Sequence, residues 1–473
     1  MRIGSFFLAT LAAASSLGAQ AATKLSPATQ RFVSVSEPLV ALTNVTIIDG
    51  TGSAPKSGQA IVIRDGKIAA VGPVASVAVP AGARVMDLAG HTVIPGIIGV
   101  HDHLFYTAAG GRSVRANFTS PRLYLASGVT TIRTTGSTGP YNDINTKAAI
   151  EQGQAPGPRI HVTAPYITGA DNAGYMTAIS SPEQARRFVN YWGDEGATWL
   201  KAYTNIRSED FKAAIDEAHK RGMKVTGHLC SVSFQEAVAL GIDNLEHGLF
   251  TASDFVADKK HNDCPNSMMR SAATAPVGGE VWQKTIKTLV DKKIPMSSTL
   301  AVYEPMFQNR PPADPRVWEA MAPEVKAAYQ AQRQQIDTNP NPVLTVAMLK
   351  QAMAFDVAFV KAGGVLGAGV DPTGIGGALP GYGDQRNYEL LIEAGFTPPQ
   401  VVQIMTLNGA RILGVDKELG SVTVGKLADL SVVKGDLAAT PSVIRNTVVV
   451  FKDGVGYDPV PLIASVKGRV GIN

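Results

Sequence analysis

Short apolar segments alternate with amphipathic ones through the middle of the chain, and this alternation limits the possible folds more than any other feature. The segment from Glu209 to Arg221 is typical, because Phe211, Ala214 and Ala218 recur at helical spacing. Strands that are followed by such helices predict βα units and a parallel sheet. Eight strands can be counted, with expected ends near His103, Thr135, Ala164, Tyr203, His228, His247, Thr299 and Asp371.

Eight βα units fit a closed (β/α)8 barrel of the TIM type better than an open, doubly wound sheet. The glycine-rich segment from Gly374 to Gly381 is the one feature that would favour a dinucleotide-binding sheet. It departs from the G-x-G-x-x-G pattern, because Leu379 occupies the third glycine position and the segment follows the eighth strand rather than the first. We therefore expect an α/β protein built on a TIM-type barrel, without a dinucleotide site.

Both ends of the chain carry β patterns of a different kind. From Val40 to Val93, short β-type runs are separated by Asp-Gly pairs, which are strong hairpin signals, and a similar pattern recurs near the C-terminus. We expect the two ends to form one small β-sandwich domain. The predicted organisation is a signal peptide at 1–21, the first part of the β domain at 22–95, the barrel at 96–414 and the second part of the β domain at 415–473.

The first residues have the pattern of a secretory signal peptide. Arg2 supplies the positive charge, Ile3 to Leu17 are mostly apolar, and Ala19-Gln20-Ala21 fits a small-residue cleavage site. We expect an exported protein, periplasmic or secreted. No later segment has about 18 consecutive apolar residues, so no membrane span is expected. The net charge is only +4 and no long run of like charges occurs, which argues against nucleic acid or an anionic membrane as a partner.

The two cysteines, Cys230 and Cys264, can form a disulfide in an oxidising compartment or remain two free thiols. We lean towards the disulfide, which would tie the loop after the fifth strand to an insertion after the sixth. Two long segments, Leu249 to Pro276 and Tyr303 to Pro342, separate the sixth strand from the eighth by more residues than ordinary units need. Both would leave the barrel at its catalytic face, where long insertions commonly form lids.

Residues that commonly bind metal ions lie at the ends of several predicted strands. His101 and His103 close the first strand, and strand alternation places both imidazoles on the same side, towards the barrel interior. Neutral imidazole is a good ligand for Zn²⁺ and similar ions, although an H-x-H pair alone is weak evidence. The signal becomes specific because four further strand ends carry Lys201, His228, His247 and Asp371.

Nearby polar residues have simpler interpretations. Glu246 alternates away from His247 on its strand, which favours a packing or ion-pair role over metal ligation. His161 lies early in the third strand, below the level of the ligands, and a structural role is favoured. Cys230 is two residues beyond His228 and is expected to be a neighbour of the site rather than a ligand.

The order of these residues resembles the amidohydrolase superfamily, in particular its binuclear members with a carboxylated lysine, such as imidazolonepropionase-like and Xaa-Pro dipeptidase-like enzymes. The resemblance covers nearly the whole chain after the signal peptide. Val93 to His103 is similar to the family's first strand. Asn408 to Gly414 and Gly425 to Leu430 are similar to its return into the small β domain.

The resemblance implies two divalent metal ions, with zinc as the expected metal. A buried lysine has a lowered pKa, so its neutral amine can add carbon dioxide, and the carbamate on Lys201 would bridge both ions. The ions would lower the pKa of a shared water enough to give a bridging hydroxide at neutral pH. Asp371 would take the proton of this hydroxide and pass it to the departing nitrogen. By resemblance, one ion is held by His101, His103 and Asp371, and the other by His228 and His247.

This chemistry predicts hydrolysis of a C–N bond in a small-molecule amide, a peptide-like compound or a cyclic amide. Tyr203 faces the same way as Lys201 and could bind a substrate oxygen, while Arg112 in the first loop could meet a substrate carboxylate. Many relatives that cleave dipeptides have an acidic residue after the arginine of the second strand, whereas Thr134 follows Arg133 here. Transfer of a dipeptide substrate therefore needs independent support.

Three alternatives remain open on the sequence. The same ligand set could serve a lactone or phosphotriester hydrolase. A mononuclear deaminase is a second alternative, although its pattern does not use a lysine on the fourth strand. A non-catalytic binding protein is the third, and it would be expected to lack some of the ligands. The oligomeric state is open as well, a homo-oligomer included.

Overall fold

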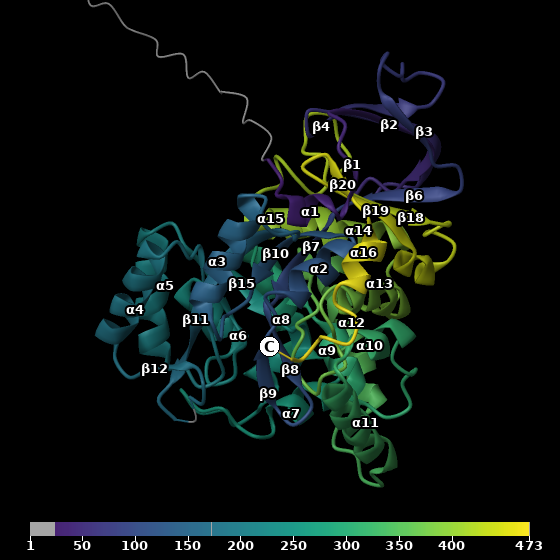
Figure 1. The fold of residues 1–473 in the computed structure, drawn as a ribbon. Helices are drawn as coiled ribbons and strands as arrows, with labels where there is room; N and C mark the ends of the chain where they lie inside the picture. The colour runs from purple at the N-terminus through teal and green to yellow at the C-terminus, as the bar shows by residue number, and fades with distance from the viewer. Residues whose placement is uncertain (1–23, 172, 473) are drawn as a thin grey trace, which may run out of the picture.

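The structure is a computed structural model that describes residues 24–171 and 173–472 (Figure 1). The predicted signal peptide at 1–21 lies outside the described residues. Among the described helices, none is both long enough and apolar enough to cross a bilayer. The barrel fills the lower part of Figure 1, and the strands from the two chain ends lie above it.

Eight parallel strands form a nearly closed barrel, in sequence order around the sheet, so the predicted TIM-type fold is confirmed. The third strand runs beyond its expected end at Ala164, because Ile167 to Gly169 pair with the added strand β12 (Thr177–Ile179). The barrel strands are β7 (Ile97–Asp102), β10 (Val129–Thr134), β11 (Arg159–Gly169), β13 (Trp199–Ala202), β14 (Lys224–Gly227), β15 (Asn244–Glu246), β16 (Met296–Ser298) and β17 (Leu366–Ala368).

The first and eighth strands meet at the carboxyl edge of the barrel. The backbone N–H of Asp371 donates to the carbonyl of His101 at 2.9 Å, and the N–H of Val370 donates to the Asp102 carboxylate at 3.0 Å. A Cβ atom on Gly369 would lie 2.4 Å from the backbone nitrogen of His101, so glycine is required for this close approach. The barrel is thereby closed at the edge where the candidate ligands lie.

Helices pack around the outside of the barrel strands (Figure 1). The predicted helix at 209–221 is confirmed as α5 (Ser208–Lys220), with Phe211, Ala214 and Ala218 buried. The other helices of the barrel layer are α2 (Thr119–Ala126), α3 (Pro140–Glu151), α4 (Pro182–Asp194), α6 (Phe234–Leu240), α8 (Glu280–Asp291), α12 (Val346–Lys361), α13 (Tyr382–Ala394), α14 (Pro398–Gln403) and α15 (Gly409–Leu413).

Strands from both chain ends combine in one nine-stranded sheet, as the sequence predicted for the small domain. The strand that leads into the barrel, β6, lies between the N-terminal β2 and the C-terminal β18. The domain boundaries given above stay predictions. The strands are β1 (Val33–Val35), β2 (Leu39–Ile47), β3 (Lys56–Arg64), β4 (Lys67–Pro73), β5 (Arg84–Asp87), β6 (His91–Pro95), β18 (Leu430–Lys434), β19 (Thr447–Lys452) and β20 (Val455–Tyr457), with the short helices α1 (Pro27–Gln30) and α16 (Pro459–Ala464) nearby.

Two insertions extend from the carboxyl edge and contact each other. Phe250 of the segment after β15 stacks on Tyr303 of the segment after β16, with ring centroids 4.0 Å apart. The first insertion contains η1 (Gly248–Thr251), η2 (Ser253–Phe255) and α7 (Met268–Thr274). The second contains α9 (Leu300–Tyr303), η3 (Glu304–Met306), α10 (Pro315–Ala320) and α11 (Pro323–Thr338).

A disulfide fixes the first of these insertions. Cys230, in the loop after β14, is bonded to Cys264, so the pairing that the sequence favoured is confirmed. The bond closes a loop with a sequence separation of 34 residues. It therefore restrains the segment between His247 and α7 relative to the end of the fifth strand.

Replacing Cys264 by serine should lower the free energy of unfolding by about 2 to 4 kcal/mol, because the unfolded chain regains the freedom of a long loop. Peptide mapping without reduction should recover one cross-linked peptide pair from the wild-type protein. Thermal unfolding of the variant and of the reduced wild type should give the same loss. Two free thiols in the oxidised wild-type protein would contradict the pairing.

Candidate active site

Six ligand-type residues gather at the carboxyl edge of the barrel. Each is one of the last two residues of a barrel strand or lies within three residues after one, so no long loop is needed to position it. His228 and His247 come directly after β14 and β15, and Asp371 follows β17 by three residues. The others are His101 within β7, His103 just after it, and Lys201 within β13.

Three of the six residues form a tight cluster. His101 Nε2 lies 3.6 Å from Asp371 Oδ2, and His103 Nε2 lies 3.3 Å from Asp371 Oδ1. One ligand atom from each of these residues lies within 4.8 Å of the others, and all three side chains are buried. The arrangement is that of a group that could hold a metal ion.

The remaining histidines continue from this cluster. The ring of His247 lies 4.4 Å from the ring of His101 and 4.4 Å from the ring of His228, measured between centroids. His247 Nδ1 is also 3.9 Å from Asp371 Oδ2. The four imidazoles and the carboxylate are therefore one continuous group, in which His228 lies next to His247 and farther from the three-residue cluster.

Hydrogen bonds fix the orientation of the histidines from behind. The Nδ1–H of His101 donates to Glu246 at 2.7 Å, and that of His103 donates to the carbonyl of Gly136 at 3.1 Å. His247 Nδ1 lies 2.7 Å from the hydroxyl of Thr299, at the end of β16. Such contacts select the tautomer and leave the Nε2 atoms of His101 and His103 facing Asp371 as available ligands.

Burial keeps the imidazoles of His101 and His228 neutral and therefore able to bind a cation. Burial, with a further contribution from Lys201, lowers the pKa of His101 to about 4 and the pKa of His228 to about 3. Burial opposes ionisation of Asp371, but His101 and His103 overcome it and hold its pKa below the usual range. The site thus combines imidazole nitrogen donors with an anionic carboxylate, which suits Zn²⁺.

Lys201 has an unusual environment for an amine. Its side chain is buried, and its Nζ atom has no hydrogen-bond partner among the described residues. Burial lowers the pKa of Lys201 to about 8, although Glu246 and Asp371 oppose the shift. An unpartnered, partly neutral amine is the form that reacts with carbon dioxide, so this residue fits the bridging carbamate that the resemblance implies.

Glu246 and His247 both lie at the histidine cluster, although strand alternation predicts that they point in opposite directions. His247 has a backbone φ of 66°, in the left-handed region, so it leaves the strand pattern and turns towards the same interior as Glu246. The Glu246 carboxylate contacts Arg133 Nη2 at 2.6 Å. The expected ion-pair role is therefore confirmed, but the pair supports His101 directly.

Arg133 and Glu246 form a buried ion pair under the histidine cluster. Both side chains are fully buried, and the guanidinium of Arg133 lies over the ring of Trp199 at 4.3 Å. Burial disfavours the charged form of Glu246, but Arg133, Lys201 and His101 hold its pKa well below the usual range. The sequence signal that could have identified this pair is an acidic residue on one strand and an arginine on another, both directed into the barrel.

The two substrate contacts suggested by the sequence have different positions. The Tyr203 ring lies 4.5 Å from the His228 ring, so Tyr203 is at the candidate site. Arg112 begins β9 (Arg112–Arg115), which pairs with β8 (Phe105–Ala108), and its exposed guanidinium donates to the carbonyl of Gly471 at 3.1 Å. The structure does not bring Arg112 to the histidine cluster.

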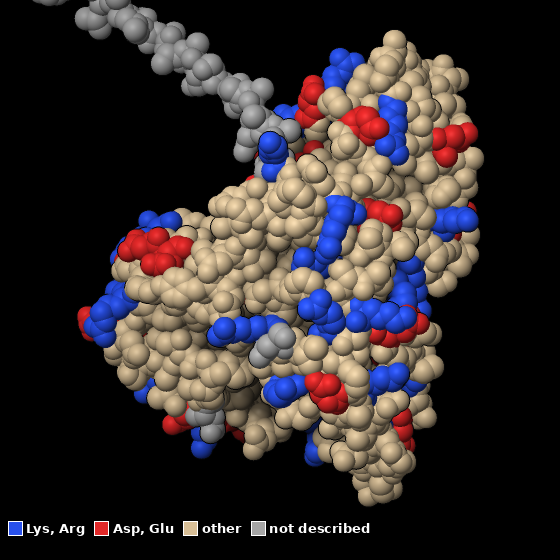
Figure 2. Space-filling view, viewed as in Figure 1, with Lys and Arg blue, Asp and Glu red and all other residues tan. Residues whose placement is uncertain are grey.

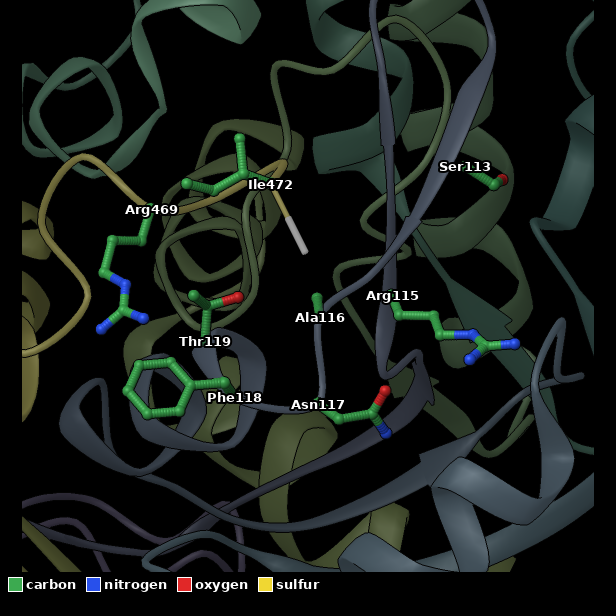
Figure 3. Close-up of a pocket in the computed structure, with 8 residues that line it drawn as sticks. All are labelled: Ser113, Arg115, Ala116, Asn117, Phe118, Thr119, Arg469 and Ile472. Carbon is green, nitrogen blue, oxygen red and sulfur yellow. The ribbon is translucent and has the colours of Figure 1, made fainter.

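A separate pocket of about 500 Å³ lies beside this hairpin (Figure 3). Arg115 from β9 and Arg469 from the C-terminal segment flank it on opposite sides. Figure 2 shows several Lys and Arg side chains around this part of the surface. None of the six candidate ligands lines this pocket, so it is distinct from the histidine cluster.

Comparison with known proteins supports the class that the fold and the cluster indicate. The model of the amidohydrolase family matches residues 92–259 and 383–457, about half of the chain. These segments include five of the six candidate ligands, namely His101, His103, Lys201, His228 and His247. No curated protein matches the chain in sequence.

Several solved structures share the fold. A putative prolidase from Bifidobacterium longum is 25% identical, with a TM-score of 0.64 over 90% of this chain and 98% of that chain. A Xaa-Pro dipeptidase with bound methionine in the active site is 19% identical, with a TM-score of 0.65 over 89% and 100%. Bottromycin amidohydrolase is 19% identical, with a TM-score of 0.68 over 94% and 93%.

A TIM-type barrel with a buried cluster of histidines and an aspartate at its carboxyl edge defines a metal-binding hydrolase. With the family match and the shared fold, the chain belongs to the amidohydrolase family. It is a hydrolase of the class that acts on carbon–nitrogen bonds.

Replacing Glu246 by glutamine should lower the free energy of unfolding of the metal-stripped protein by about 3 to 5 kcal/mol, because Arg133 would keep a buried charge without a counterion. Chemical denaturation measures this loss. Glu324→Gln, at an exposed position in the first turn of α11, is the matched control and should change stability by less than about 0.5 kcal/mol. Equal stabilities for the two variants would show that the buried pair does not support the site.

Proposed function

We propose that this protein is an exported amidohydrolase that uses two divalent metal ions, expected to be zinc, to hydrolyse an amide, peptide-like or cyclic amide bond in a small molecule. The observation that carries the proposal is the convergence of His101, His103 and Asp371 into a cluster of possible metal ligands. The neighbouring Lys201, buried and without a hydrogen-bond partner in the described part of the chain, supports the binuclear form.

The residues divide naturally into two sets of ligands. His101, His103 and Asp371 would hold one ion, because their ligand atoms already lie together. His228 and His247, with adjacent rings, would hold the other, and Lys201 would bridge the two ions as a carbamate. When bound, the ions would supply the Lewis acidity that activates a water molecule and polarises the substrate carbonyl.

Asp371 is the residue to which we assign proton transfer in the reaction. Its carboxylate is anionic and accepts a hydrogen bond from the Thr373 hydroxyl on Oδ1 at 2.9 Å. This bond restrains the rotation of the carboxylate. We propose that Asp371 accepts the proton of the attacking water and delivers it to the amine that leaves, which amide cleavage requires because an unprotonated amine leaves poorly.

Export is part of the proposal. The N-terminal pattern at 1–21 has the charge, the apolar stretch and the small residues of a signal peptide. The disulfide between Cys230 and Cys264 supports this assignment, because structural disulfides persist mainly in oxidising compartments. In a Gram-negative cell the protein would be periplasmic.

The choice of an amide substrate has support from two sides. The prolidase, Xaa-Pro dipeptidase and bottromycin amidohydrolase structures that share this fold are named for peptide or amide substrates. The proton transfer that we propose for Asp371 is needed for an amine leaving group and is less needed for an activated ester. A lactone or phosphotriester hydrolase and a mononuclear deaminase are outcomes that the following tests can detect.

Replacing Lys201 by alanine should reduce the content of divalent metal from about two ions per chain to one or fewer, because the proposed bridge is removed. Metal analysis after dialysis measures this change, and short carboxylates should restore part of the second ion by occupying the empty space. Lys212→Ala, on the exposed face of α5, is the matched control and should keep both ions. A wild-type protein that saturates at one ion would contradict the binuclear proposal.

Replacing Asp371 by asparagine should lower the turnover of an N-acyl amide by at least about a hundredfold, because the proton carrier is lost. Hydrolysis of a nitrophenyl ester should fall by a smaller factor, since its leaving group departs without a proton. Metal analysis of the variant separates a catalytic loss from loss of a ligand. Equal losses on both substrates at equal metal content would contradict the proton role, and efficient lactone or phosphotriester turnover without amide cleavage would contradict the substrate class.

A further inference from the structure

A second cavity lies between the insertion that follows β16 and helix α13. Its volume is about 580 Å³, which is in the range of small-molecule pockets. Residues from η3, α10 and α11 line it, together with Gly377 and Ala378 from the loop after β17 and Tyr382 at the start of α13. Figure 1 shows α10, α11 and α13 on one side of the molecule. None of the six candidate ligands lines this cavity, so it is separate from the histidine cluster.

Aromatic rings form part of the cavity lining. Trp318 of α10 and Tyr329 of α11 both line the cavity, and their ring centroids are 5.2 Å apart. Tyr382 is a third aromatic residue of the lining. It is only 4% exposed, and its hydroxyl has no hydrogen-bond partner among the residues that the structure describes. The cavity therefore combines ring surface with a buried hydroxyl whose hydrogen-bonding capacity is unused.

The charged side chains at the cavity pair with one another. Glu304, for example, contacts Arg310 at 2.6 Å and Arg386 at 2.7 Å. Every described charged residue that lines the cavity belongs to one set of ion pairs, in which positive and negative charges are equal in number. The set consists of Arg310, Arg316, Arg333, Arg386 and Arg445 with Glu304, Asp314, Asp337, Glu389 and Glu393.

We propose that this cavity binds a neutral, planar small molecule that carries an aromatic ring and a hydrogen-bond acceptor. A ring of the ligand can pack against Trp318 and Tyr329 and gains buried apolar area and favourable ring contacts. The acceptor can meet the hydroxyl of Tyr382 or a guanidinium, because a guanidinium has more N–H donors than these ion pairs use. The inference concerns a site other than the histidine cluster and does not rest on the proposed amide hydrolysis.

The balanced ion pairs are the reason for a neutral ligand. A charged group that leaves water must recover its hydration energy from an opposite charge or from hydrogen bonds. At this cavity an anion or a cation would have to displace the existing partner of an arginine or a carboxylate. The carboxylates of Glu304 and Glu389 are buried, and the removal of one partner from a buried pair is costly. A neutral ligand leaves all the pairs intact.

The cavity shares chain segments with the histidine cluster. Ala301 and Glu304 line it, and Tyr303, which lies between them in the sequence, meets the ring of His247 at 5.7 Å. The backbone N–H of Ala301 donates to Asn387 of α13 at 2.8 Å, and the amide of Asn387 donates at 2.6 Å to the carbonyl of the residue that follows β17. A ligand in the cavity would therefore contact the segment that carries Tyr303 without occupying the proposed metal site.

Four bicyclic probes without an amide or ester bond test the class of ligand, and NMR titration of the probes with the full-length protein measures each Kd. Chromone is neutral and planar with a carbonyl acceptor, chromone-2-carboxylate is the matching anion, 1-methylquinolinium is a planar cation, and 1-decalone is a saturated neutral ketone. We expect chromone to bind the metal-free protein with a Kd of about 1 mM or lower, at least about fivefold more tightly than each of the other three. Loading with zinc should leave the Kd of chromone unchanged, because none of the candidate metal ligands lines the cavity.

Variants of the lining connect the binding to this cavity. Ala313→Phe adds a ring to the half-buried lining and should weaken chromone binding by at least about tenfold, because it fills part of the space. Ala331→Phe, at an exposed position of α11 outside the lining, is the matched control and should bind as the wild type does. Trp318→Leu should weaken binding by at least about threefold, whereas Trp318→Phe keeps a ring and should retain most of the affinity. Thermal unfolding of each variant shows that it is folded.

Crystals soaked with chromone should show the ligand beside Trp318 and Tyr329, and ligand density only at the histidine cluster would overturn the inference. A failure of chromone to bind at millimolar concentration would also overturn it. Equal affinities of the wild type and folded Ala313→Phe would place the ligand elsewhere. If Ala313→Phe does not fold, equal affinities of Trp318→Leu and Trp318→Phe decide against the site in the same way. Binding of either ion or of 1-decalone as tight as that of chromone would contradict the neutral aromatic class.

Discussion

The meeting of the first and eighth barrel strands is the constraint on which the site depends. The hydrogen bond from Asp371 N–H to the His101 carbonyl and the close packing of Gly369 against the same residue bring two distant parts of the chain together. Without this closure, the carboxylate of Asp371 would have no reason to lie beside His101 and His103. Asp371 itself has a φ of 48°, a left-handed conformation that turns its side chain out of the strand pattern.

A second constraint is the cost of burying charge inside the barrel. Arg133 and Glu246 neutralise each other below the site, and the second carboxylate oxygen of Glu246 accepts a hydrogen bond from His101. Burial lowers the pKa of Lys201, so its amine is neutral more readily than an exposed lysine. The interior therefore holds a paired arginine and glutamate and, beside them, a buried amine whose Nζ has no hydrogen-bond partner among the described residues, which is the position we propose for the carbamate.

The sequence predicted the barrel and the residues at its strand ends because both follow from periodicity. Strand alternation puts His101 and His103 on one side, and parallel strands bring all their carboxyl ends to one edge. Periodicity fails where the backbone leaves the regular pattern, and this is why the direction of Glu246 relative to His247 was misjudged. Left-handed residues such as His247 cannot be recognised from alternation.

Features that depend on packing between distant loops could not be predicted from the sequence either. Tyr203 could be placed near the site because it directly follows a barrel strand, whereas Tyr303 comes from a segment whose path no local pattern predicts. Arg112 was expected to meet the substrate for lack of such packing information. Its hairpin instead directs it to the C-terminal segment. The disulfide partner of Cys230 could be favoured only because the chain holds two cysteines.

We propose that six residues at one barrel edge form a binuclear metal site with Lys201 as the bridge. Anomalous diffraction at the zinc edge, from crystals grown with zinc and bicarbonate, tests it most directly. The account predicts two anomalous peaks, one beside His101, His103 and Asp371 and one beside His228 and His247, with branched density extending from Lys201 Nζ between them. A single peak, or an unmodified lysine that contacts neither peak, would contradict it.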